Sequence, residues 1–279
     1  KLVIPMAKSL IASESNCIDS LVQLGEQCRQ LGALQEAAEL YHRIGKIAPD
    51  HIHAAFAQHL LAVPEANKRH FDEGPAPFVQ ARDFLRKPLR DHLLHQMTND
   101  LQKFEDAKVY DNADGRGESN PNLRRGKYLP FDYTSTYTES FLPELKSFVQ
   151  SSSILRRLGI TNPSRMRFEV QVTNYSDGEF FARHIDNGTP ALKNRKVSYV
   201  YYVSRTESSF QGGDLILYDK RSALNDEPFS SYTRIHPMDN SIVFFDSSRM
   251  HEVLPTFVEN KKREDGRFSI NGWLLAIDE

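Results

Sequence analysis

The chain has few cysteines, no long apolar run and almost no net charge. Only two of its 279 residues are cysteines, Cys17 and Cys28, and on one helix they would lie about 16 Å apart, which is beyond disulfide reach. This argues against a disulfide-stabilised secreted domain and favours a cytoplasmic compartment. No apolar stretch reaches the roughly 20 residues of a membrane-spanning helix. A formal charge of −2 gives no attraction to nucleic acid or an acidic membrane, so we expect neither as a partner.

Helical periodicity dominates the N-terminal part of the sequence. Residues 17–63 space apolar side chains three and four positions apart, as amphipathic helices do. Part of this region resembles one tetratricopeptide repeat (TPR). The residues at the spacings of the repeat are Leu24, Gly25, Gly32, Ala37, Tyr41 and Pro49. The alternative is an ordinary helical hairpin. We predict a helical TPR-like region over residues 1–70 and a Gly/Pro-rich linker, FDEGPAPF, over residues 71–78.

The remaining residues, 79–279, are predicted to form a second domain. Residues 83–104 indicate a short strand followed by an amphipathic helix, and residues 139–159 indicate another helix. From Arg165 onward the period becomes two. The predicted strands are RMRFEVQVTNY, EFFARHID, VSYVYYVS, GDLILYD, SYTRIHP, NSIVFF, HEVLP and FSINGWLLAI. Short strands separated by turn residues predict an α+β fold with flanking helices and a double-sheeted jelly roll or barrel over residues 165–279.

Two His-x-Asp triplets are candidates for metal binding. His184-Ile185-Asp186 lies at the end of a predicted strand, where residues two apart point to the same face. His70-Phe71-Asp72 lies between a helix and a Gly/Pro-rich segment, where nothing directs the two side chains to one side. We therefore interpret the first triplet as a pair of metal ligands and the second as solvated surface.

A third ligand is sought among His236 and His251. His251 opens a short strand that would return beside the first triplet in a jelly roll, whereas His236 precedes a proline in a turn. We prefer His251. Two imidazoles and one carboxylate form the facial triad of non-haem Fe(II) enzymes. Zn²⁺ accepts the same ligand types, so the three residues alone leave the metal open.

Arg267 opens the last predicted strand, whose other residues are mostly apolar. An unpaired guanidinium there would be costly, and arginine binds carboxylates through parallel hydrogen bonds. One interpretation is a salt bridge at the strand edge. The other is a pocket for the distal carboxylate of 2-oxoglutarate, whose keto acid would chelate the iron.

Five segments together resemble the catalytic domain of the Fe(II)/2-oxoglutarate-dependent dioxygenases, in particular the prolyl hydroxylase branch. They are NYSDGEFFARHIDN, VSYVYYVS, QGGDLILY, NSIVFFDSSRMHEVLPT and RFSINGWL, and they occur in the order of the family. The resemblance implies that residues 165–279 form a double-stranded β-helix, a form of the jelly roll, and that His184, Asp186 and His251 bind iron. It also implies that Arg267 binds the distal carboxylate of 2-oxoglutarate.

Further site residues follow from the same resemblance. Tyr202 stands where family members place a hydroxyl on the distal carboxylate. Tyr175 stands where they place an aromatic ring at the mouth of the site. Ser269 and Trp273 follow on the last strand, and Trp273 would form a wall of the pocket.

The resemblance also implies a reaction. Fe(II), 2-oxoglutarate and O₂ would hydroxylate an unactivated C–H bond with release of succinate and CO₂, and ascorbate is a further candidate cofactor. Halogenating relatives lack the carboxylate ligand, so the presence of Asp186 favours hydroxylation. The non-enzymatic alternative is an interaction protein in which the jelly roll is only a scaffold beside the TPR-like repeat.

Two substrate classes stay open. One is a prolyl or other side chain in a peptide, with the N-terminal helices helping to hold the polypeptide. The other is a free amino acid or small metabolite, with those helices serving packing or dimerisation. The loops at 187–196 and 219–231 follow predicted strands near the metal and are candidates for substrate selection. Arg124, Arg125 and Lys127 are either a site for an acidic substrate or a solvated loop.

Overall fold

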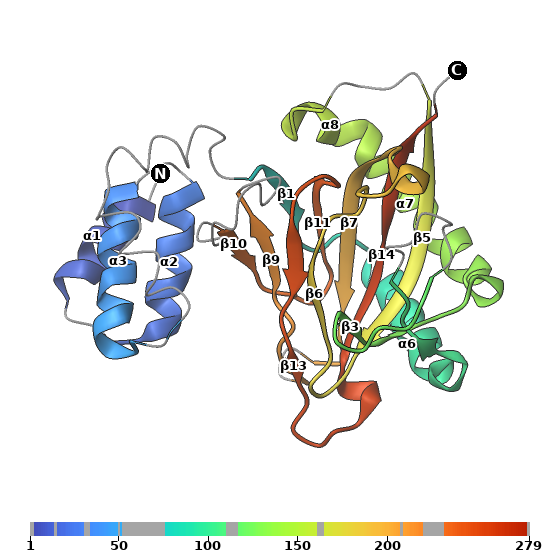
Figure 1. Cartoon of the computed structure of the whole chain (residues 1–279), viewed down its shortest axis with the longest axis horizontal. Helices are drawn as coiled ribbons and strands as arrows, with labels where there is room; N and C mark the ends of the chain where they lie inside the picture. Colours follow the sequence, from blue (N-terminus) through green and yellow to red (C-terminus); the bar gives the residue numbers. More distant parts are fainter. Residues whose placement is uncertain are drawn as a thin grey trace. The chain divides into compact units, whose positions relative to one another are not determined.

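The structure, a computed structural model, describes residues 3–13, 16–30, 34–49, 51, 76–109, 117–160, 165–206, 209–219 and 232–277 (Figure 1). The chain divides into two compact units, Lys1–Ala76 with Leu217–Arg234, and Pro77–Ile216 with Ile235–Glu279. Within the described ranges, no helix is long and apolar enough to cross a membrane.

Within its described residues, the first unit contains three helices, α1 (Val3–Ala12), α2 (Ile18–Gln30) and α3 (Leu34–Ile47). Gly25 of α2 lies against the ring of Tyr41 of α3, since a Cβ on this glycine would be 2.6 Å from the ring. The helical prediction for 17–63 is confirmed over 18–30 and 34–47, and α1 lies within the helical region predicted for residues 1–70. The TPR character stays a prediction. The described residues do not include Gly32, residues 52–70, most of the 71–78 linker or the triplet at His70.

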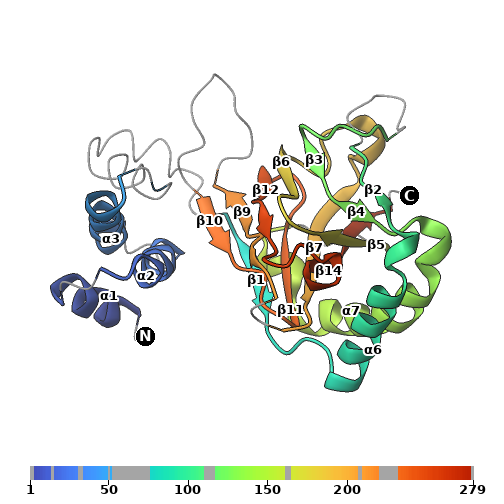
Figure 2. The same ribbon diagram turned by 90° about the horizontal axis from the view of Figure 1, so that it is seen from below.

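The second unit contains a seven-stranded antiparallel sheet with the order β1-β11-β7-β14-β5-β4-β2. Its strands are β1 (Phe78–Ala81), β2 (Glu105–Asp106), β4 (Lys127–Tyr128), β5 (Met166–Tyr175), β7 (Arg195–Val203), β11 (Ser241–Asp246) and β14 (Arg267–Ala276). Figure 2 shows α6 (Lys87–Asn99) and α7 (Ser135–Ser152) on one side of this sheet. On its other side lie β6, β9 and β12.

Those strands belong to a five-stranded sheet with the order β10-β9-β12-β6-β3. Its members are β3 (Arg124–Arg125), β6 (Phe180–His184), β9 (Leu215–Tyr218), β10 (Tyr232–Ile235) and β12 (His251–Val253), and a separate pair is formed by β8 (Gln211–Gly212) and β13 (Thr256–Phe257). The short remaining elements are α8 (Ile154–Arg157), η1 (Leu101–Lys103), η2 (Phe131–Tyr133), η3 (Pro190–Leu192) and η4 (Arg263–Asp265). Two facing antiparallel sheets with helices on one side are the predicted α+β, jelly-roll-like architecture.

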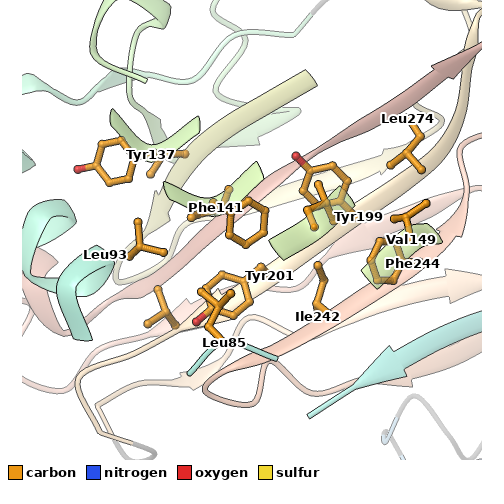
Figure 3. Close-up of a cluster of buried hydrophobic side chains, with 14 of the residues drawn as sticks. Leu85, Leu93, Tyr137, Phe141, Val149, Tyr199, Tyr201, Ile242, Phe244 and Leu274 are labelled. Carbon is orange, nitrogen blue, oxygen red and sulfur yellow. The ribbon is translucent and has the colours of Figure 1, made fainter. Parts of the chain in front are cut away.

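The core of this unit lies between the helices and the outer face of the seven-stranded sheet (Figure 3). Phe141 of α7 packs against Tyr199 and Tyr201 of β7, with ring centroids 6.2 and 5.4 Å away, and all three rings are fully buried. Aromatic burial of this kind contributes much of the packing energy of a domain. The packing therefore fixes which face of β7 points toward the second sheet.

Alternation along β7 and β14 separates core residues from site residues. The core side takes Val197, Tyr199, Tyr201, Val203, Phe268, Ile270 and Leu274. The residues between them point to the opposite face, and they include Ser198, Tyr202, Arg267, Ser269 and Trp273. The predicted period of two thus determines which polar side chains face the second sheet.

All eight predicted strands are present, but two predictions in the flanking region were wrong. The predicted helix over 139–159 is divided into α7 and α8 at Ser153, whose φ of 54° lies in the left-handed region. The strand expected at the start of 83–104 lies earlier, in β1, because the chain turns at Asp83, where φ is 51°.

Candidate metal centre

Two histidines meet where β6 pairs with β12. His184 is the last residue of β6, His251 is the first of β12, and the two are directly paired across the strands. The next pair is Phe181 with Val253, so β6 carries one residue more than β12 between the two pairs. A bulge of this kind redirects side chains. Here it accompanies the stacking of the His184 ring on Phe181, with centroids 3.5 Å apart.

Asp186 completes the cluster from the turn after β6. One carboxylate oxygen lies 3.6 Å from Nε2 of His184, and the other lies 3.4 Å from Nε2 of His251. The three ligand atoms are all within 4.8 Å of one another, close enough to hold one metal ion. The prediction that Asp186 continues the strand of His184 was wrong, since β6 ends at His184. The three predicted residues nevertheless converge.

The other ring nitrogen of each histidine is hydrogen-bonded to the backbone. Nδ1 of His184 lies 2.8 Å from the carbonyl oxygen of Ala182, and Nδ1 of His251 lies 2.9 Å from that of Arg249. A carbonyl only accepts, so each Nδ1 carries a proton and each Nε2 is the nitrogen left to bind a metal. Burial, followed by the effect of His251, lowers the pKa of His184 to about 3. Its imidazole is therefore neutral at physiological pH, as a metal ligand must be.

The carboxylate of Asp186 is held from behind by Ser198 and Trp273. Ser198 Oγ donates a hydrogen bond of 2.5 Å to Oδ2, and the indole of Trp273 donates another. Burial opposes ionisation of Asp186, but the two histidines and these hydrogen bonds outweigh it and keep its pKa below the ordinary value. The Trp273 ring is itself covered by Arg195, whose guanidinium lies 3.4 Å from the ring centroid and pairs with Glu169.

His236, the other candidate for the third ligand, is not part of this cluster. Its side chain is exposed, and its Nδ1 lies 3.0 Å from a carboxylate oxygen of Asp214. Across the part of the chain that the structure describes, His184, Asp186 and His251 form the one group of three suitable ligands.

A second polar pocket surrounds Arg267. This side chain is fully buried, and its Nε has no hydrogen-bond partner in the described residues. The same holds for two buried hydroxyls, Tyr202 Oη and Thr256 Oγ1. A Cβ on Gly213 would lie 2.7 Å from Cδ of Arg267 and 2.9 Å from Oγ1 of Thr256, so Gly213 borders the same space. Buried donors without partners indicate a ligand site, and a guanidinium with two hydroxyls suits a carboxylate.

The other predicted site residues lie close to both pockets. The Tyr175 ring centroid is 5.4 Å from Cζ of Arg267, and Ser269 Oγ is 2.7 Å from Oγ of Thr173. Tyr175, Ser269, Trp273, Arg267 and the three metal-ligand candidates line one cavity of about 60 Å³. Tyr202 is not among the residues that line this cavity, but its ring centroid lies 4.8 Å from Cζ of Arg267, which does line it.

Sequence comparisons match this arrangement of residues to a known family. Residues 170–275 match the family model described as the 2OG-Fe(II) oxygenase superfamily. This region is similar to 2OG-Fe(II) oxygenase domains. It contains the triad and Arg267, and the family implies Fe(II) and 2-oxoglutarate as cofactor and co-substrate. Both pockets fit these groups, because one offers two imidazoles and a carboxylate and the other offers buried donors for a second carboxylate.

Known proteins resemble the oxygenase domain in sequence and in fold. Over 109 residues the chain is 35% identical to the uncharacterized PKHD-type hydroxylase sll0191 of Synechocystis sp.. This aligned segment covers 38% of this chain and 35% of that protein. The chain thus spans about a third of the length of this curated relative. A prolyl hydroxylase of Trichoplax adhaerens, solved with a hypoxia inducible factor oxygen degradation domain peptide fragment, has a TM-score of 0.52 at 22% identity, covering 75% of this chain and 86% of that chain. A Pseudomonas putida prolyl-4-hydroxylase has a TM-score of 0.49 at 20% identity, covering 76% and 98%.

Proposed function

We propose that this chain is an Fe(II)- and 2-oxoglutarate-dependent hydroxylase that acts on a C–H bond of a peptide side chain. The observation that carries the proposal is the pairing of two sites in one cavity. A triad of His184, Asp186 and His251 lies beside a buried guanidinium at Arg267 whose Nε has no partner in the described residues. The first site suits a metal with open positions, and the second suits the far end of a dicarboxylic acid.

Each side chain then has a definite task. The triad would hold the iron, with Ser198 and Trp273 fixing the carboxylate ligand. Arg267, Tyr202 and Thr256 would bind the distal carboxylate of 2-oxoglutarate and so direct its keto acid toward the metal. When bound, the iron and 2-oxoglutarate supply the oxidation of the C–H bond, with release of succinate and CO₂. The walls of the small cavity exclude water from this reaction.

A groove outside the metal cavity supports an extended substrate such as a peptide. A space of about 520 Å³ is lined by His184 and Asp186 of the triad, and another of about 640 Å³ adjoins it. The two share the lining residues Gln171, Thr189, Leu192, Arg195 and Trp273. Aromatic residues, including Tyr128 and Phe131, line the outer space, and aromatic grooves suit extended peptides. We further propose that the N-terminal helices, as a TPR-like unit, help to hold the polypeptide.

Turnover assays test the proposal. The protein, loaded anaerobically with Fe(II), receives 2-oxoglutarate, ascorbate and air in the presence of either a peptide pool or a panel of amino acids and small metabolites. Succinate release and a mass increase of one oxygen atom are expected with peptides and not with Asp186→Ala. Oxidation of metabolites alone would favour the tailoring-enzyme alternative. Absence of 2-oxoglutarate-dependent oxidation with both panels would argue for a non-catalytic protein.

A further inference from the structure

Arg124 is a second buried arginine beside the triad, and the reaction proposed above does not use it. It lies in β3, opposite Phe181 of β6, and only 8% of its surface is exposed. Its side chain lines both the small cavity at the triad and the 520 Å³ groove outside it. The neighbouring basic residues differ, since Arg125 is exposed and Lys127 pairs with Asp106.

The hydrogen-bond partners of Arg124 are all uncharged. Its Nε donates to the Tyr175 hydroxyl at 3.1 Å, and Nη1 donates to the carbonyl oxygen of Lys108 at 3.1 Å. Its Nη2 lies 3.5 Å from Oε1 of Gln171. No carboxylate in the described part of the chain forms an ion pair with it. A buried cation without a counter-ion is unfavourable, which points to an anionic ligand.

Stacking holds the guanidinium in a fixed place relative to the triad. Its Cζ lies 4.6 Å from the centroid of the Phe181 ring, and that ring is stacked on the imidazole of His184. A group bound to Arg124 would therefore lie near the metal but outside the pocket of Arg267. Tyr175 separates the two arginines, with its hydroxyl on Arg124 and its ring 5.4 Å from Cζ of Arg267.

The groove around Arg124 is basic. Its described lining residues include the basic side chains Lys108, Arg124, Arg183 and Arg195, of which Arg195 is paired with Glu169 from outside the lining. Among those described lining residues, Asp186 is the one acidic side chain, and it belongs to the triad. A concave surface lined by one sign of charge attracts ligands of the opposite sign.

We propose that Arg124 binds a carboxylate of the substrate, either an acidic side chain or a chain terminus, and thereby selects acidic substrates. The inference rests on the proposed function, because it takes the groove as the substrate side of an oxygenase. Arg267 would bind the co-substrate carboxylate and Arg124 the substrate carboxylate. The planar fork of arginine suits both tasks.

The test uses trifluoroacetate as the carboxylate probe and trifluoroacetamide as its uncharged counterpart. The chain of residues 1–279 is loaded with Mn(II), a paramagnetic substitute for iron, and with N-oxalylglycine, which is to occupy the 2-oxoglutarate pocket. Fluorine relaxation then reports binding near the metal. We expect relaxation enhancement for trifluoroacetate and none for the amide. Arg124→Gln, which can still donate to Tyr175, should weaken the apparent affinity by roughly 10-fold, as expected for a lost charge-assisted contact.

Matched variants decide the interpretation. Arg125→Gln removes the adjacent exposed charge and should leave the enhancement unchanged, while Arg124→Lys should retain most of it even if Arg124→Gln folds poorly. Equal enhancement in wild type and Arg124→Gln would overturn the proposal. Enhancement that occurs only without N-oxalylglycine would assign Arg124 to the co-substrate and overturn it as well.

Failure of the proposed function is recognised separately. If the electron paramagnetic resonance signal of free Mn(II) persists in the presence of protein, the metal site itself is wrong. Trifluoroacetate line broadening is then measured on the metal-free protein with the same variants. Loss of broadening in Arg124→Gln alone would still support an anion site, and equal broadening would overturn it.

Discussion

His184 and His251 are direct partners across β6 and β12, with ring centroids 4.1 Å apart. They come from segments 67 positions apart in the sequence, and only the pairing of the two strands brings them together. The bulge in β6 and the backbone acceptors at Ala182 and Arg249 set the orientation of the rings. The candidate metal site therefore depends on the pairing of β6 with β12 in the five-stranded sheet.

Removing the guanidinium of Arg267 should weaken 2-oxoglutarate binding most. Two charge-assisted hydrogen bonds, each contributing about 1.5–3 kcal/mol, would be lost in Arg267→Ala, so the KM for 2-oxoglutarate should rise by roughly 100-fold or more. Tyr202→Phe and Thr256→Val each remove one hydroxyl, and each should raise the KM for 2-oxoglutarate by about 10-fold. Steady-state succinate release measures all three. An unchanged KM in Arg267→Ala would place the co-substrate elsewhere.

Gly213→Ala should fill the pocket of Arg267 directly. The added Cβ would lie 2.7 Å from Arg267 and 2.9 Å from Thr256, and Gly213 has a φ of +65°. Gly178→Ala is the matched control, since its φ is +72° and nothing lies within 4 Å of the added Cβ. Both variants should lose about 1–2 kcal/mol of stability from backbone strain. Only Gly213→Ala should also weaken 2-oxoglutarate binding in isothermal titration, and equal binding by the two variants would refute the assignment.

Ser198→Ala should weaken metal binding without touching a ligand. Its hydroxyl is one of the donors that hold the carboxylate of Asp186, and loss of such outer partners typically costs 10–100-fold in metal affinity. Trp273→Phe removes the indole donor and should act in the same direction. Ser248→Ala is the control, because that hydroxyl bonds Asp246 instead. Competition with a metallochromic indicator measures the affinities, and similar values for Ser198→Ala and Ser248→Ala would contradict this role.

Phe141→Ala should destabilise the second unit by about 3–5 kcal/mol, because a fully buried aromatic ring leaves a cavity when truncated. Phe131→Ala removes a ring that is 85% exposed and should change stability by less than about 0.5 kcal/mol. Urea denaturation of the two variants provides the comparison. Equal losses would mean that the helix-to-sheet packing is not the stabilising core.

Much of the second unit could be predicted from the sequence, because the alternation of inward and outward side chains along a strand is visible as a period of two in the sequence. The period of two in VSYVYYVS places Tyr199 and Tyr201 in the hydrophobic core and directs Ser198 and Tyr202 to the opposite face of the strand. The role of Ser198 was signalled by its polar position in that strand. Thr256 carried no such signal. Its relevance depends on β13, which is two residues long, and on the close approach of Gly213.

Other features depend on tertiary contacts that no local pattern contains. Arg124 and Arg125 are adjacent and chemically identical in the sequence, yet one is buried beside the triad and the other is exposed. The bulge that accompanies the stacking of His184 on Phe181 arises from the register between β6 and β12. The convergence of Asp186 was predicted for the wrong local reason, since a turn and not a strand presents it.

Anaerobic titration of Fe(II) and 2-oxoglutarate tests the central claim most directly, because the chelate of the two gives a weak visible charge-transfer band. The account predicts the band in the wild type and in His236→Ala, whose histidine lies outside the triad. It predicts loss of the band in His251→Ala. Absence of the band in the wild type, or an unchanged band in His251→Ala, would contradict the account.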